Sequence, residues 1–173
     1  AAASRTPCFS FSALRVSAQL AARPAHDEPG RSVFAYGPAD LEPHHPGFFW
    51  YGIHALEALY ALMGPGCAAV SQRHTDRADV LTGTWRDGRV ATVQGNRNGC
   101  REFGVTIFGA KNIATVRLTP DFREWAAQLV AFFRSSVAPV PLAETLEILA
   151  FMEAGEESAR RGGRPVGIEE MFD

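Results

Sequence analysis

The chain has 173 residues, of which 46% are hydrophobic and 21% charged, and a formal net charge of −2 at pH 7. This length and composition suit one globular domain with a hydrophobic core and exclude an intrinsically disordered chain. The small net charge gives no reason to expect binding to nucleic acid, and no apolar run reaches the ~20 residues of a membrane span. Three scattered cysteines (Cys8, Cys67 and Cys100) favour a reducing compartment and small buried side chains over a disulfide framework. We therefore expect a cytoplasmic protein with one domain over residues 1–173.

The N-terminal stretch is rich in Ala, Ser and Arg and has no acidic residue before Asp27. This composition is compatible with an organelle transit peptide, but a continuous apolar segment typical of a secretory signal is missing. Residues Ser12–Arg23 also fit a first helix, with Ser12 as its N-cap. A third alternative is that the chain is the back part of a longer protein.

The next strong helix signal is the stretch from Gly47 to Gly66, which predicts a helix over Phe49–Met63. Gly64-Pro65-Gly66 ends it, because glycine supplies the C-terminal cap and proline cannot continue a helix. The helix is apolar nearly all round, which is typical of a buried helix. Two polar side chains, His54 and Glu57, share one side of it because they are three residues apart. They either form an internal pair or face a pocket that contains water, because a buried charged group needs a hydrogen-bonding partner or solvent.

Strand signals flank this helix. Asp87-Gly88 predicts a hairpin turn, and the glycines inside strands (Gly83 and Gly95) indicate bulges or close backbone contacts. The sequence therefore predicts a largely antiparallel meander after the helix. The expected strands are Ser32–Tyr36, Cys67–His74, Asp79–Trp85, Arg89–Gly95, Glu102–Phe108, Ile113–Leu118 and a short edge strand within Pro165–Ile168.

Two helices follow the last of the long strands. The first begins after Thr119-Pro120-Asp121, and its apolar stripe (Phe122, Trp125, Leu129 and Phe132) predicts a face packed on the sheet. The second is expected over Leu142–Arg161 and ends at Gly162-Gly163. Its inward residues are predicted to be Leu146, Leu149, Phe151 and Met152, and its solvated face Glu147, Glu153, Glu156 and Glu157.

Recognisable cofactor and catalytic motifs are missing from the sequence. No G-x-G-x-x-G follows an expected strand, and there is no P-loop, H-E-x-x-H or G-x-S-x-G motif. The adjacent His44 and His45 have no cysteine or carboxylate at a spacing that supports a metal site. The residues alone thus indicate neither a nucleotide-binding part nor a complete catalytic set.

Taken in order, the segments resemble the C-terminal domain of the Gfo/Idh/MocA oxidoreductases, a family that includes glucose–fructose oxidoreductase and inositol dehydrogenase. The resemblance covers about residues 10–166. The segments that carry it are Tyr51–Glu57, Leu62–Gly66, Trp85–Arg89, Phe132-Phe133, Pro139–Glu147 and Phe151–Ala154.

The resemblance implies an α+β domain with an open, mainly antiparallel sheet and helices on one face. It implies that this domain forms the substrate pocket and, through the other sheet face, a homo-oligomer. In the family an N-terminal Rossmann domain binds NAD(P), and the resemblance implies that this domain is absent from the chain. The isolated chain is then expected to be inactive.

His54 corresponds to the histidine of the family's Asp-x-x-x-His pair, which handles the proton of the substrate hydroxyl together with a lysine of the nucleotide domain. Trp50 stands four residues before His54, where the family often has Asp, and Glu57 is the candidate replacement. Tyr51, Trp50 and Arg15 are further candidates for contact with substrate, although a surface role for Arg15 is equally open.

By this resemblance the intact protein is an NAD(P)-dependent oxidoreductase acting on a sugar, polyol or related hydroxy compound. Two alternatives remain open at this point. One is a non-catalytic module for ligand binding or dimerisation, which the tryptophan at position 50 favours. The other is a lyase or isomerase that uses NAD transiently.

Overall fold

The computed structural model describes residues 6–22 and 31–172. Its helices are α1 (Ala18–Ala21), α2 (Ile53–Met63), α3 (Phe122–Ser135) and α4 (Leu142–Arg160), with 3-10 turns η1 (Gly47–Phe49) and η2 (Ile168–Met171). Its strands are β1 (Ser32–Pro38), β2 (Cys67–His74), β3 (Ala78–Trp85), β4 (Val90–Asn96), β5 (Phe103–Phe108), β6 (Ile113–Leu118) and β7 (Val166–Gly167).

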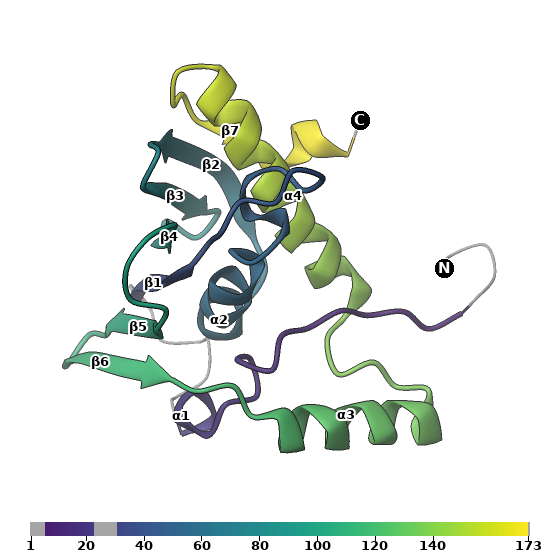
Figure 1. Cartoon of the computed structure of the whole chain (residues 1–173). Coiled ribbons are helices and arrows are strands. Elements are labelled where there is room, and N and C mark those ends of the chain that lie inside the picture. The colour runs from purple at the N-terminus through teal and green to yellow at the C-terminus, as the bar shows by residue number, and fades with distance from the viewer. Residues whose placement is uncertain (1–5, 23–30, 173) are drawn as a thin grey trace.

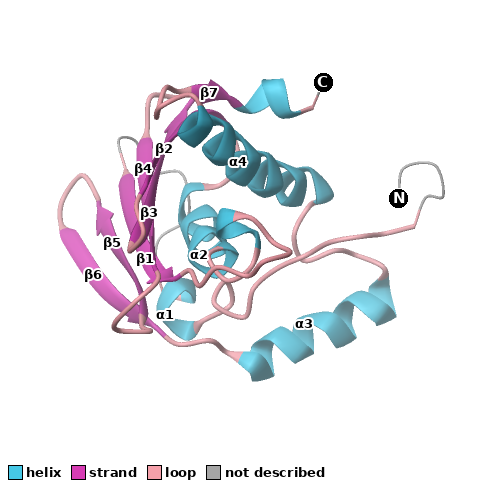
Figure 2. Cartoon of the chain, turned by 45° about the horizontal axis from the view of Figure 1, so that its top comes forward, coloured by secondary structure: helices cyan, strands magenta, loops and turns pink. Residues whose placement is uncertain are grey.

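The strands form one open sheet in the order β6-β5-β1-β4-β3-β2-β7. Every neighbouring pair is antiparallel except β1 and β4, which are parallel. Helix α2 packs on β1, β4 and β5, and α4 packs on β2 (Figure 1). Figure 2 shows both helices on the same side of the sheet, with no described helix on the other side. The predicted α+β class, with an open and mainly antiparallel sheet, is confirmed.

The insertion of β1 changes the predicted meander. β2, β3 and β4 follow one another, as do β5 and β6, but β1 lies between β4 and β5. The Asp87-Gly88 turn is the predicted hairpin, with Gly88 at φ +87° and the Trp85 N–H donating to the Arg89 carbonyl at 2.8 Å. The connection from β4 to β5, in contrast, passes over β1 and does not form a hairpin. Turn residues indicate where a strand ends, but they do not indicate which strand lies beside it in the sheet.

Two glycines allow other segments of the chain to approach the sheet closely. A Cβ on Gly83 would lie 2.5 Å from Cε2 of Phe151 in α4, and one on Gly95 would lie 2.5 Å from Cβ of Ala39. Both distances are shorter than real carbon contacts, so both positions need glycine. The structure thus confirms the close contacts predicted from glycine, whereas the register shift of the β2–β3 pair lies elsewhere, between Cys67 and Ala69.

The N-terminal helices are shorter than predicted. α2 begins at Ile53 rather than Phe49, because the chain forms the separate turn η1 and then buries Phe48 against Gly52. The expected first helix over Ser12–Arg23 is reduced to α1, and Arg23 lies outside the described residues. The Ser12 hydroxyl accepts a hydrogen bond from the Leu14 N–H at 3.2 Å, a local turn that competes with a helix start.

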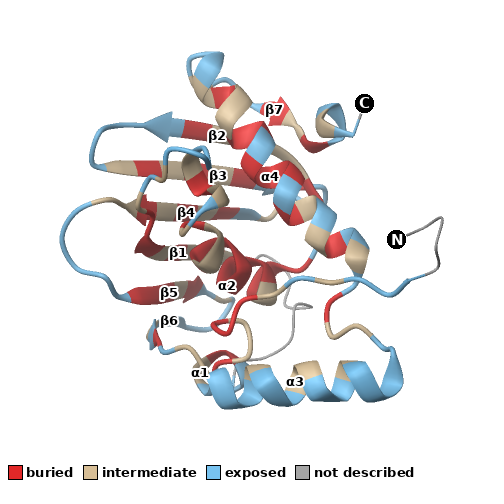
Figure 3. Cartoon of the chain, turned by 45° about the vertical axis from the view of Figure 1, so that its right-hand side comes forward, coloured by how far each residue is buried: buried red, intermediate tan, exposed pale blue. Residues whose placement is uncertain are grey.

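Several expectations about burial are wrong. Figure 3 shows α3 standing clear of the sheet, and none of its residues is buried. In α4, Phe151 and Met152 are buried as predicted, but Leu146 and Leu149 are exposed beside Phe49 and Met171. Of the cysteines only Cys67 is buried, and Cys8 and Cys100 are exposed.

Glu147 is not part of a solvated face. Its Oε1 accepts hydrogen bonds from the backbone N–H groups of Gly66 and Cys67, at 2.7 and 2.8 Å, and from the Tyr60 hydroxyl at 3.2 Å. These bonds join α4 to the beginning of β2 and the end of α2. Glu147 therefore satisfies backbone donors that would otherwise be buried without partners.

Candidate functional site

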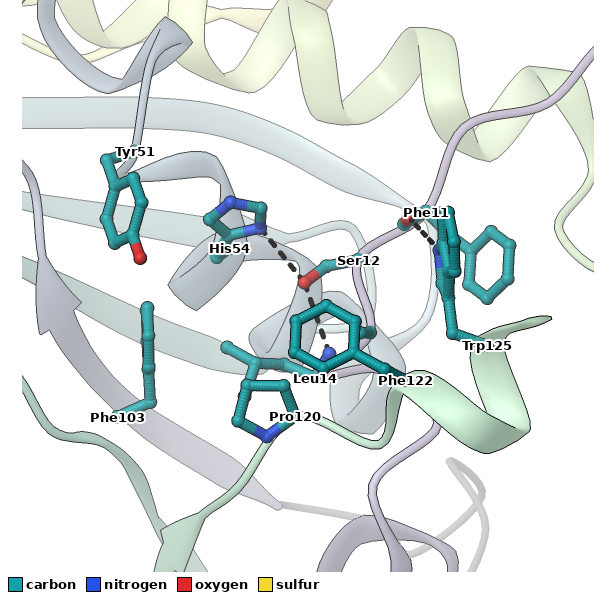
Figure 4. Close-up of a pocket in the computed structure, with 10 residues that line it drawn as sticks. Phe11, Ser12, Leu14, Tyr51, His54, Phe103, Pro120, Phe122 and Trp125 are labelled. Atoms are coloured by element: carbon teal, nitrogen blue, oxygen red, sulfur yellow. Dashed lines mark hydrogen bonds between the residues drawn. The ribbon is translucent and has the colours of Figure 1, made fainter.

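A pocket of about 220 Å³ opens beside the first turn of α2, where the segment before α1, the start of α3 and β5 meet. Figure 4 shows the His54 ring between Tyr51 and Phe103 on one side and Phe122 and Trp125 on the other. The lining residues are Phe11, Ser12, Ala13, Leu14, Tyr51, His54, Phe103, Pro120, Phe122 and Trp125. Most are apolar or aromatic and a few carry polar atoms, which is the composition of small-molecule pockets.

His54 is half-buried in this pocket. Its Nδ1 lies 3.0 Å from the Oγ of Ser12, and this is its one side-chain hydrogen bond among the described residues. The rings of Tyr51 and Phe103 meet the imidazole edge to face, with centroids 5.1 and 6.3 Å away. These contacts fix the orientation of the ring, and its Nε2 is available to a ligand.

Burial in this apolar pocket lowers the pKa of His54 below its usual value, because the charged imidazolium loses solvation. The imidazole is therefore neutral at pH 7. A neutral histidine can accept a proton from a hydroxyl group, which is the role of a general base.

Tyr51 lies at the outer edge of the same pocket. The Arg101 guanidinium sits over its ring, 5.3 Å from the centroid, and makes two hydrogen bonds to the Asp40 carboxylate, at 3.0 and 2.7 Å. Arg101 holds the pKa of the Asp40 carboxyl below its usual value. The structure thus brings Tyr51 and His54 together, as predicted, and adds a charged pair behind the tyrosine.

The structure places the predicted site residues Arg15 and Glu57 behind the pocket. Arg15 donates to Glu57 at 3.0 Å and also binds Glu144 of α4. Burial raises the pKa of the Glu57 carboxyl to about 7 against the opposing effect of Arg15, and the nearby negative charge of Glu144 contributes to this rise. None of the three lines the pocket, and Glu57 contacts Arg15 rather than His54. They tie the N-terminal segment to α2 and α4.

Trp50 lies away from the pocket. Its side chain is 49% exposed and stacks on His45, with ring centroids 5.4 Å apart and planes at 9°. The position at which the family often has Asp is therefore on the surface, just before α2 begins. The contact of Trp50 with a ligand stays a prediction, and Trp50 does not line this pocket.

Several pocket residues were missed from the sequence. The sequence pattern predicts a core face for Phe122 and Trp125, and it indicates Phe103 only as part of a strand. Ser12 was interpreted as a helix N-cap, which is a sound local interpretation of a serine before an apolar run. Nothing in the order of the residues indicates that its hydroxyl meets His54, which lies 42 positions away.

The pocket does not fit a whole dinucleotide. Among the described residues no lysine or arginine lines it, and its polar atoms come from Ser12, Tyr51, His54 and backbone groups. The phosphates of NAD(P) need a cluster of backbone N–H groups or positive charge. In the described part of the chain there is also no group of three or more His, Cys, Asp or Glu residues that can hold a metal ion.

No helix of the described residues is long and apolar enough to cross a membrane. No protein-family model matches the sequence, and no curated protein matches it. The comparisons that find relatives are therefore those of structure.

Three dehydrogenases illustrate the structural matches. Scyllo-inositol dehydrogenase from Lactobacillus casei, solved with NAD(H) and scyllo-inositol, matches with a TM-score of 0.64 and 12% identity over 83% of this chain and 58% of its own. Myo-inositol 2-dehydrogenase from Lactobacillus plantarum gives 0.65 and 13%, over 79% of this chain and 56% of its own. The WlbA dehydrogenase from Bordetella pertussis, solved with NADH and UDP-GlcNAcA, gives 0.59 and 17%, over 81% of this chain and 56% of its own.

The chain thus spans less than two thirds of the length of these proteins. At 12 to 17% identity the likeness establishes the fold. The neighbours are oxidoreductases of the Gfo/Idh/MocA type, as the resemblance in the sequence implies. The chain therefore has the fold of a part of the Gfo/Idh/MocA oxidoreductases.

Proposed function

We propose that this chain is the substrate-binding, C-terminal domain of an NAD(P)-dependent oxidoreductase that acts on a sugar, a polyol or a related hydroxy compound. The observation that carries the proposal is the half-buried His54 in an aromatic pocket on this fold. The solved neighbours that bind scyllo-inositol or UDP-GlcNAcA support the substrate class. NAD(P) would be held by a nucleotide-binding domain outside this chain, because the pocket residues do not fit it, and the chain alone would then be inactive.

In this proposal the pocket binds and orients a hydroxylated ring. The faces of Tyr51, Phe103 and Trp125 offer apolar surface to its C–H groups, and the free nitrogen of His54 faces its hydroxyl. His54 takes the hydroxyl proton as the alcohol is oxidised and returns it in the reverse direction. The bound cofactor supplies the hydride chemistry.

The first experiment replaces His54 with Ala in the complete oxidoreductase. With myo-inositol, scyllo-inositol and a panel of sugars as substrates and NAD or NADP as oxidant, we expect kcat to fall by roughly 10²–10⁴-fold. The matched control is His45→Ala, since His45 is exposed and lies outside the pocket. An unchanged kcat in His54→Ala would show that the catalytic role is wrong.

A second candidate function is ligand binding without turnover. It is favoured by the surface position of Trp50 and by the bonding of Glu57 to Arg15, which leave His54 without a carboxylate partner. Titration calorimetry of this chain with the same polyols measures binding. Binding by the chain, together with no turnover by the complete protein, supports this candidate. A lyase or isomerase that uses NAD transiently would convert substrate without net accumulation of NAD(P)H.

We also propose that the uncovered face of the sheet forms a homo-oligomer. Phe34 and Tyr36 of β1 lie on this face, only partly buried, while their neighbours Val33 and Ala35 are buried beneath α2. Light scattering of a Phe34→Arg variant is expected to show loss of the oligomer. Phe133→Arg, on the exposed side of α3, is the matched control and should leave the oligomer intact.

A further inference from the structure

The hydrogen bond between Ser12 and His54 joins two segments that are far apart in the sequence. Ser12 is 7% exposed and lies in the segment before α1, and its Oγ is 3.0 Å from Nδ1 of His54. Figure 4 shows the two side chains facing one another at the wall of the pocket. The neighbouring residue of this segment, Leu14, donates its N–H to the same oxygen at 3.2 Å.

This arrangement limits the hydrogen bonds that the serine hydroxyl can make to His54. A hydroxyl has one proton and two lone pairs, and the Leu14 N–H occupies one lone pair. One proton and one lone pair therefore remain for His54. The oxygen donates to Nδ1 when that nitrogen is bare, and it accepts from Nδ1 when that nitrogen carries a proton.

A carboxylate at this place would behave differently. An ionised carboxylate only accepts hydrogen bonds, so it fixes the proton on Nδ1 and stabilises the charged imidazolium. When the other nitrogen takes up a proton, Nδ1 carries an N–H both before and after the transfer, so the hydroxyl accepts from Nδ1 in both states and adds no charge to an apolar pocket. The nearest acidic side chain on the same helix, Glu57, binds Arg15 instead.

We propose that Ser12 is the positioning residue of His54, a neutral hydroxyl that orients the imidazole through Nδ1 while the other nitrogen exchanges a proton with the substrate. This inference rests on the proposed function of His54. It assigns to the N-terminal segment the orienting role for which the sequence offers Glu57. Arg15, three residues further on, anchors the same segment to α2 and α4 and so fixes the place of Ser12.

The test observes the His54 ring directly, without turnover. The protein is labelled with 15N-histidine, and the Nδ1 and Nε2 signals of His54, assigned with His54→Ala, are followed by NMR from pH 4 to pH 9. In Ser12→Ala we expect the Nδ1 signal to move toward that of a nitrogen without a hydrogen-bond partner. Ser12→Thr keeps the hydroxyl and should restore the wild-type signals.

Ser12→Asp tests the expected difference between a carboxylate and a hydroxyl at this position. A carboxylate facing Nδ1 stabilises the imidazolium, so the titration midpoint of His54 should move up by about one pH unit or more. Ser17→Ala is the matched control, because Ser17 is also buried in this segment and its Oγ has no partner among the described residues. It should leave the His54 signals unchanged. If Ser12→Ala does not fold, Ser12→Cys provides a near-isosteric side chain with a weak donor.

In the complete oxidoreductase, Ser12→Ala should lower kcat about tenfold with little change in KM, and Ser12→Thr should recover it. Unchanged His54 signals in folded Ser12→Ala overturn the positioning role, whatever the activity. Changed signals together with full turnover in His54→Ala overturn the proposed function but support the positioning of the ring. The two hypotheses thus fail on different measurements.

Discussion

The consecutive helices α3 and α4 lie in opposite surroundings. Phe151 of α4 is fully buried against Trp85 and Tyr60, whereas Phe133 of α3 is 80% exposed. The sequence of α3 has the more regular apolar stripe, yet none of its 14 residues is buried. A regular stripe shows that one side of a helix can be covered by apolar groups, but the covering element has to be found in the structure.

The largest expected difference comes from truncating one phenylalanine in each helix. Phe151→Ala leaves a cavity beside Gly83 and should lower the free energy of unfolding by about 3–5 kcal/mol. Phe133→Ala removes a side chain that contacts mainly solvent and should change it by less than about 0.5 kcal/mol. Urea denaturation measures both. Similar losses in the two variants would mean that α3 is covered in solution and that the contrast is wrong.

The second prediction concerns the buried Glu57 of α2, which binds Arg15 of the N-terminal segment. Because burial raises the pKa of Glu57 to about 7 from an ordinary value of 4.5, the native state holds a proton that the unfolded chain has released. The free energy of unfolding should therefore fall as pH rises from about 4.5 to about 7, by up to about 3 kcal/mol from this group.

Glu57→Gln removes this titration. The difference in free energy of unfolding between variant and wild type should therefore change with pH inside that interval and stay constant outside it. Denaturation at closely spaced pH values measures it. Glu153→Gln is the control, since Glu153 is exposed on α4. A wild-type slope in Glu57→Gln would show that Glu57 does not titrate in this range.

A third prediction tests how α4 is joined to β2. Glu147→Ala leaves the N–H groups of Gly66 and Cys67 without their acceptor and should cost about 2 kcal/mol. Hydrogen exchange at these two amides should speed up in parallel. Glu153→Ala, six residues further along α4, should have neither effect.

The smallest expected effect is at the start of α3. The Asp121 side chain accepts a hydrogen bond from the Glu124 N–H at 2.9 Å and caps the helix. Asp121→Ala should destabilise α3 by about 1 kcal/mol. Because α3 buries no residue, hydrogen exchange should speed up within α3 while the global unfolding midpoint stays nearly constant. A large fall in the global midpoint would show that α3 folds cooperatively with the sheet.

Much of the fold can be predicted from local signals. Alternating apolar residues, the Asp87-Gly88 turn and the glycine stops located the strands of the sheet and the end of α2, and the predicted bounds of β2 and β6 are those observed. The pairing of β1 with β4 and β5 is decided by contacts across more than 50 residues, which no local pattern encodes.

The candidate site divides in the same way. His54 stands out because an imidazole is unusual in an otherwise apolar helix, and Tyr51 shares its side. Ser12 and Trp125 join the pocket only through the path of the N-terminal segment and of α3. The prediction for Glu147 is wrong for a related reason: the helix pattern alone suggests a solvated carboxylate, and the backbone N–H groups that it accepts from lie in another segment.

The segment of residues 11–14 is both a pocket wall and the support of His54. Any shortened form of the protein that starts after residue 14 would lose Phe11, Ser12, Ala13 and Leu14 together, although the sheet and α4 would remain. Such a form would also lose Leu14 from the hydrophobic core, where this side chain is 1% exposed. Biochemical work on this domain should therefore keep residues 11–14 intact.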